Sequence, residues 1–105
     1  MTLKDLENIP MLQTRSIAEA CQDPQTLGYV SKCMLQFING QWGDLDREDI
    51  EANNEDLKDG YGHVLARYPF KYALENDIYI ETHFDKDHMN DINYTQTMIM
   101  YVDER

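Results

Sequence analysis

The chain has 105 residues, with 20 Asp or Glu against 9 Lys or Arg, and a formal net charge of -11. This length suits one core, so we expect a single domain over residues 1–105, with residues 1–13 loosely ordered because their apolar periodicity is weak. The charge argues against direct binding to nucleic acid, which needs clustered Lys and Arg, and favours a partner with a basic protein surface.

The sequence also bears on location. No run approaches the roughly 20 apolar residues that span a bilayer, and the segment MTLKDLENIP has Asp5 and Glu7 where a secretion signal has cations and an apolar core. We therefore expect a cytoplasmic protein with no membrane contact. Cys21 and Cys33 match no CxxC pattern and are predicted to be buried free thiols.

Short elements are predicted first along the chain. Residues 12–14 could form a short strand, and Ser16 with Glu19 has the spacing of a capping box that opens a short helix, SIAEAC. Asp23 and Pro24 suit the cap and first position of the first main helix. This helix is expected to run to about Asn39 and to stop at Gly40. Its expected core stripe comprises Leu27, Val30, Met34, Phe37 and Ile38.

The second main helix is predicted to begin at Asp46 and to end at Gly60. Leu45 and Ile50 have the spacing of a hydrophobic staple. Its inward stripe is narrow, with Ile50, Leu57 and either Asn53 or Asn54. Most of this helix is therefore expected to face water or a partner.

The period then changes from helical to alternating. Three strands are predicted, at about residues 64–68, 77–83 and 95–102. The loop-sized gaps between them indicate an antiparallel meander. The predicted fold is thus α+β, with two main helices packed on a three-stranded antiparallel sheet. The polar segment from Phe84 to Asn93 is long for a hairpin turn and is a candidate working loop.

Several short motifs carry a resemblance. They are Thr14-Arg15 with Ala18-Glu19, then NGQWGDL from Asn39 to Leu45, Ala52-Asn53, and GHVLARY from Gly62 to Tyr68. Together they resemble small acidic plasmid and prophage proteins of Firmicutes with an NGxWGDL motif. The resemblance covers about residues 14–83, and it weakens after that. Small acidic proteins of this origin include inhibitors of CRISPR effector nucleases, so the resemblance implies such a role by analogy.

The candidate partner-binding residues lie in the acid-rich segment after Asn39. They are Trp42, Asp44, Asp46, Glu48, Asp49, Glu51, Glu55 and Asp56. Carboxylates along one helix could occupy a positively charged channel that otherwise holds nucleic acid. The alternative is a solvated helix face. Trp42 is either an exposed anchor for the partner or a ring that closes the core between the helices.

A second cluster could bind a metal ion. On a strand, Glu81, His83 and Asp85 would share a face, and His88 could return from the loop. The candidate zinc ligands are His83, Asp85, Asp87 and His88, with His63 as a further one. The spacing is not diagnostic of zinc, and a polar loop that solvates its own acids explains it equally.

No catalytic motif accompanies these clusters. The sequence lacks a phosphate-binding glycine loop, GxSxG and HExxH, so we expect no enzyme and no required cofactor. The leading hypothesis is an inhibitor from a phage or mobile element that binds a Cas9-type effector nuclease and blocks nucleic-acid loading or target cleavage. The alternatives are a small zinc protein or metal-dependent hydrolase using His83 and His88, and a plasmid accessory protein.

Overall fold

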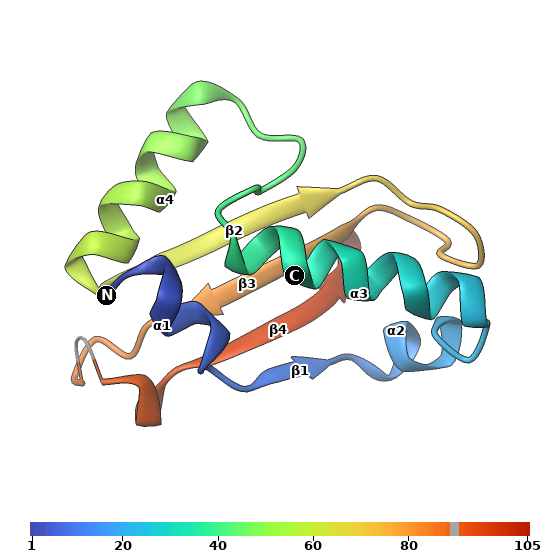
Figure 1. Cartoon of the computed structure of the whole chain (residues 1–105), viewed down its shortest axis with the longest axis horizontal. Helices are drawn as coiled ribbons and strands as arrows, with labels where there is room; N and C mark the ends of the chain where they lie inside the picture. Colours follow the sequence, from blue (N-terminus) through green and yellow to red (C-terminus); the bar gives the residue numbers. More distant parts are fainter. Residues whose placement is uncertain (89–90) are drawn as a thin grey trace.

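The computed structural model describes residues 1–88 and 91–105 and shows an α+β fold (Figure 1). Its helices are α1 (Leu3–Glu7), α2 (Arg15–Ala20), α3 (Pro24–Ile38) and α4 (Arg47–Asp59), with the 3-10 turns η1 (Ile92–Tyr94) and η2 (Val102–Glu104). The strands are β1 (Met11–Gln13), β2 (His63–Tyr68), β3 (Ile78–His83) and β4 (Gln96–Tyr101). Both predicted main helices are present, as α3 and α4.

The sheet has four strands in the order β1-β4-β3-β2. The predicted antiparallel meander is confirmed for β2, β3 and β4, but β1 joins parallel to β4, with Leu12 opposite Met98. The prediction of a three-stranded antiparallel sheet is therefore wrong in this detail. A short strand was expected near this position, at residues 12–14, but three residues carry no signal for the distant strand that they join.

The N-terminal segment is part of the core. Leu6 and Ile9 are buried, and α1 packs against α3. Residues 1–13 therefore form a helix and a strand on the body of the protein, in place of the loose segment expected from their weak periodicity.

Helix α3 confirms most of its predicted stripe, because Val30 and Phe37 are buried and Met34 and Ile38 pack against the core, but Leu27 does not join it. Asp23 caps it, accepting a hydrogen bond from the Thr26 N–H at 3.0 Å, and Pro24 takes the first position as expected. The buried side chains are Thr26, Val30, Cys33 and Phe37. Leu27, expected in the core, is 52 % exposed because polar Thr26 and small Cys33 occupy the inward positions. Apolar side chains thus lie on two faces of α3.

Smaller details also differ from the predictions. Helix α2 is capped by Thr14, whose hydroxyl accepts from the Ile17 N–H at 3.4 Å, and not by Ser16. Glu19, expected to complete a capping box, instead pairs with Arg15 at 3.1 Å. The two cysteines are buried free thiols, as predicted, and burial raises the pKa of each.

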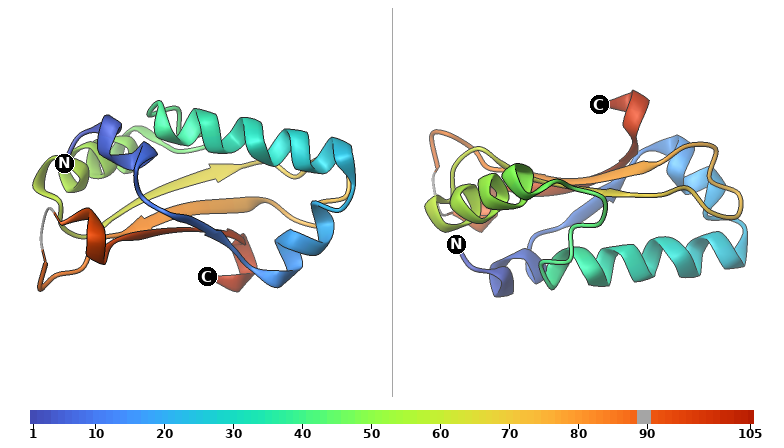
Figure 2. Two further views of the ribbon diagram at one scale, coloured as in Figure 1. Left: turned by 60° about the horizontal axis from the view of Figure 1, so that its bottom comes forward. Right: turned by 90° about the horizontal axis from the view of Figure 1, so that it is seen from above.

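The helices α1 and α3 cover one face of the sheet, and the C-terminus leaves on the other side (Figure 2). In β2 and β3, buried residues on the helix side alternate with less buried residues on the other side, as with the buried Val64, Ala66 and Tyr68 of β2. In the core, the hydroxyl groups of Thr82 and Thr97 form a hydrogen bond with each other, with an oxygen–oxygen distance of 2.6 Å. Within the described ranges, no helix has the length and apolar character to cross a membrane.

Candidate functional site

The acid-rich segment closes one edge of the sheet. Strand β2 is the last strand of the sheet at this side, and α4 lies beside it (Figure 1). Before α4, the chain pairs with the strand through Gly43, since the Arg67 N–H donates to the Trp42 carbonyl at 3.1 Å and the Asp44 N–H donates to the Arg67 carbonyl at 2.8 Å. We call this side, from His63 to Tyr68, the β2 edge.

Asn53 continues this pairing from α4. Its amide nitrogen donates to the Leu65 carbonyl at 2.8 Å, and its oxygen accepts from the Leu65 N–H at 3.0 Å. The side chain is only 4 % exposed and so imitates the backbone of a neighbouring strand. The sequence offered Asn53 or Asn54 as inward residues, and the structure selects Asn53. The feature of the sequence that pointed to this contact was an amide side chain in the narrow inward stripe of an otherwise acidic helix.

Trp42 belongs to the core. Its ring is 5 % exposed, and its Nε1 donates to the Phe37 carbonyl at 3.3 Å. The interpretation of Trp42 as an exposed partner anchor is therefore wrong, and the alternative of a ring that closes the core is confirmed. Gly43 is needed beside it, because its φ is +74° and a Cβ there would come 1.9 Å from the Arg67 carbonyl oxygen.

Three of the predicted acidic residues take part in local structure. Asp46 caps α4, accepting from the Asp49 N–H at 2.9 Å. Asp56, half-buried, accepts from the His63 N–H at 3.3 Å. The backbone N–H of Asp44 donates to the Arg67 carbonyl, while the Asp44 carboxylate is exposed to solvent. Asp44 and Asp56 thus bond to residues of β2, whereas Asp46 stabilises the start of α4.

The remaining acids face solvent on one side of α4. Glu48, Glu51 and Glu55 follow one another at three- and four-residue spacing and are all exposed, on the side away from Asn53 and Leu57. We call these three residues the acidic face. Asp49 is exposed as well, in the first turn, where its charge favours the helix dipole. Arg47 pairs with Glu51 at 3.1 Å, an exposed contact that offsets part of the charge.

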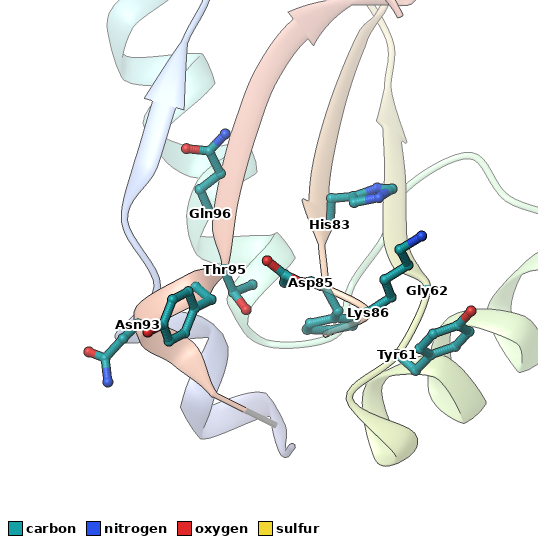
Figure 3. Close-up of a pocket in the computed structure, with 10 residues that line it drawn as sticks. Tyr61, Gly62, His83, Asp85, Lys86, Asn93, Thr95 and Gln96 are labelled. Carbon is teal, nitrogen blue, oxygen red and sulfur yellow. The ribbon is translucent and has the colours of Figure 1, made fainter. Parts of the chain in front are cut away.

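The candidate zinc ligands separate into two pairs. His63 and His83 lie opposite each other on β2 and β3, with stacked rings 6.4 Å apart. Glu81, the acid expected beside His83, instead binds Arg105 at 2.9 Å. Strand β3 ends at His83, so Asp85 lies outside the strand, and the Asp85 carboxylate and the His83 ring point in different directions (Figure 3).

The second pair is Asp85 and His88. His88 Nδ1 lies 3.5 Å from Asp85 Oδ2, and its ring stacks on Tyr94. The Asp87 N–H donates to Asp85 at 2.8 Å, and with a smaller effect of His88 this lowers the pKa of Asp85. Asp87 itself is exposed. Across residues 1–88 and 91–105, no three His, Cys, Asp or Glu side chains converge as a zinc site requires.

A groove lies at the end of the sheet and is lined by one member of each pair, His83 and Asp85 (Figure 3). It has a volume of about 760 Å³, and its walls include Tyr61, His83, Lys86, Asn93 and Gln96. The candidate working loop from Phe84 to Asn93 forms one side of it, although Met89 and Asn90 lie outside the described residues. Because the described donors do not gather in the groove, zinc binding stays a prediction that elemental analysis of the purified protein can test.

Comparison of the chain with protein-family models, curated proteins and solved structures gave no match. The function is therefore argued from the geometry. Two features define the candidate site, namely a helix anchored to the β2 edge by its inner side and a row of carboxylates on its outer side.

Proposed function

We propose that the protein is a stoichiometric inhibitor that binds a basic protein surface through the acidic face of α4, and that its target is a Cas9-type effector nuclease. One observation carries the proposal. The inner side of α4 is fixed to the β2 edge through Asn53, so Glu48, Glu51 and Glu55 are presented on a rigid element and not on a loop.

The spacing of the acidic face suits a charged channel. Glu55 follows Glu48 by seven positions, and this separation corresponds to about 10 Å along the helix at about 1.5 Å per residue. Negative charges repeated at this scale resemble the charge of a nucleic-acid strand, and effector nucleases hold their guide–target duplex in a positively charged channel. The charge of -11 adds long-range attraction to such a surface.

The position of the charge also supports binding over simple solvation. A charge needed only for solubility can lie anywhere on the surface. Here eight acids and two bases lie between Asp44 and Asp59, whereas α3 carries Lys32 as its one charged residue. Such concentration leaves repulsion within α4 that a basic partner would relieve.

The test is a DNA cleavage assay with a Cas9-type nuclease, its guide RNA and increasing amounts of the protein. The variant Glu48→Gln, Glu51→Gln, Glu55→Gln removes the acidic face and leaves the cap Asp46 intact. The matched control, Glu75→Gln, Asp87→Asn, Asp103→Asn, changes the net charge equally at exposed positions outside α4. Circular dichroism checks that both remain folded.

We expect inhibition by the unchanged protein and the control, with at least about a tenfold loss for the acidic-face variant, equal to about 1.4 kcal/mol. Inhibition should also weaken as salt rises, because the contacts are screened. Equal inhibition by both variants would contradict the role of the acidic face. Absence of inhibition by the unchanged protein would contradict the target, and an acid-dependent complex with a different bacterial protein would then favour a plasmid accessory role.

A further inference from the structure

Helix α3 has exposed apolar side chains beside its buried stripe, next to Met34 and Ile38, which pack against the edge of the core. Leu35 is 60 % exposed and Leu27 is 52 % exposed, while Met34 and Ile38 are half-buried. These residues recur at three-, four- and seven-residue spacing and lie beside, not within, the buried stripe. An apolar face of this kind on a helix marks a contact surface.

This face forms one wall of a groove whose other wall belongs to the N-terminal segment. The groove has a volume of about 470 Å³, and Ile9 and Met11 lie across it from Met34, Leu35 and Ile38. Met11 begins β1, so the groove runs beside the sheet edge opposite α4 (Figure 2). We call this side of the molecule, from Met11 to Gln13, the β1 edge.

The β1 edge also presents backbone groups. The Pro10 carbonyl accepts from the Thr97 N–H and the Thr14 N–H donates to the Ile99 carbonyl, so these groups face β4. Because directions alternate along a strand, the N–H and C=O groups of Met11 and Gln13 point outward. In the part of the chain that the structure describes, no strand lies beyond β1.

The charge distribution points to the occupant. Glu7 is the only charged residue among those that line the groove, and from Ile9 to Gly43 Arg15 and Lys32 balance Glu19 and Asp23, so this side carries far less acid than α4. A basic partner would be drawn to α4 and not to this less acidic surface. A second copy, by contrast, can approach an acidic molecule most easily where the acid is least dense.

We propose that the β1 edge and the groove beside it bind a second copy of the chain. Antiparallel pairing of the two β1 strands about Leu12 is a two-fold symmetric contact. It sets Met11 against Gln13 of the second copy and satisfies the outward backbone groups of both edges. Leu12, 46 % exposed, and Leu35 are covered in the same contact. The two acidic faces remain at the far edges of the joined sheet.

The pairing is short, which sets its strength. β1 has three residues, and Pro10 before it carries no N–H to donate. Few hydrogen bonds form, and the apolar face of α3 supplies most of the contact. We therefore expect a dissociation constant in the range of about 1 to 100 µM.

Sedimentation equilibrium from about 1 µM to about 500 µM tests this proposal. The expected mass rises from 12.4 kDa toward twice that value. Leu35→Lys should weaken association at least tenfold, whereas Phe70→Lys, at a side chain 61 % exposed on the β2–β3 loop, makes the same change and should leave it unaltered. Both variants bring the net charge nearer zero, which alone would ease association.

Amide hydrogen exchange gives a second readout without any substitution. Exchange at Met11 and Gln13 should slow as the protein is concentrated, while exchange at Leu12, whose N–H faces β4, should not change. A mass of 12.4 kDa throughout would overturn the proposal. Equal weakening by the two lysine variants, or dimerisation with unchanged exchange at Met11 and Gln13, would place the contact elsewhere and would also overturn it.

Discussion

Along the β2 edge, the backbone of Leu65 bonds to the side-chain amide of Asn53, the backbone of Arg67 bonds to that of the Trp42–Asp44 segment, and charged α4 covers the strand. Along the β1 edge, Met11 and Gln13 face outward beside exposed Leu35, and the local charge is balanced. The first edge is closed within the chain, and the second is open. This difference shows that one side of the acid-rich segment stabilises the fold while the other side faces solvent. Only the solvent-facing side can bind a partner.

The largest effect is expected from substitution of Gly43, because it would break the closed edge at its tightest point. In Gly43→Ala the new Cβ meets the Arg67 carbonyl oxygen at 1.9 Å, and the φ of +74° is itself unfavourable. We expect a loss of about 3 kcal/mol in the free energy of unfolding, measured by urea denaturation. The control is Gly28→Ala, in the middle of α3 with open space around it, which should raise stability by up to about 1 kcal/mol.

The next effect concerns the amide that imitates a strand. Asn53→Ala leaves the Leu65 N–H and C=O without partners at a buried position, and we expect a loss of about 2 kcal/mol. Asn54→Ala, one residue along the same helix and exposed, should change stability by less than about 0.5 kcal/mol. Equal losses in the two variants would mean that Asn53 does not close the edge.

The smallest effect is electrostatic and lies at the end of the β2 edge. Asp77 accepts from the Phe70 N–H at 2.9 Å and pairs with Arg67 at 3.0 Å, and these contacts lower its pKa from the ordinary 3.8. The stabilisation is therefore complete above the unfolded-state pKa and is lost as pH falls through the lower folded-state value.

Asp77→Asn keeps the shape and removes the charge. Between about pH 5 and pH 2 the unchanged protein should lose more stability than this variant, by less than about 1 kcal/mol because the pair is partly exposed. Asp103→Asn, at an exposed position, is the control and should follow the unchanged protein. The contrary result would be parallel pH profiles for the unchanged protein and Asp77→Asn.

Much of the fold was predictable because its signals are local. The cap and proline at Asp23 and Pro24, the cap at Asp46 and the stop at Gly60 mark α3 and α4, and alternation marks β2 to β4. The signals failed where a distant partner decides. β1 was expected as a strand near residues 12–14, but its partner lies far along the chain. Thr26 is buried in α3 in place of Leu27 because its hydroxyl donates to the capping carboxylate of Asp23 and accepts from the Ala73 N–H.

The candidate site was predictable in part, for the same reason. The sequence places the acids on one helix, and helical spacing alone puts Glu48, Glu51 and Glu55 on one side. It does not show that Asp56 and Asn53 hold β2, since these contacts join residues on separate elements. The open β1 edge was missed because it depends on the strand order and on the rotation of α3.

The contrast between the two edges can be measured in one experiment, amide hydrogen exchange at a protein concentration below the lowest dissociation constant expected for self-association. The predicted result, with the sample diluted to about 0.1 µM so that the monomer prevails, is strong protection of the Leu65 and Arg67 amides, which donate to Asn53 and Trp42, together with fast exchange at Met11 and Gln13. Fast exchange at Leu65 and Arg67, or equal protection at both edges, would contradict the account.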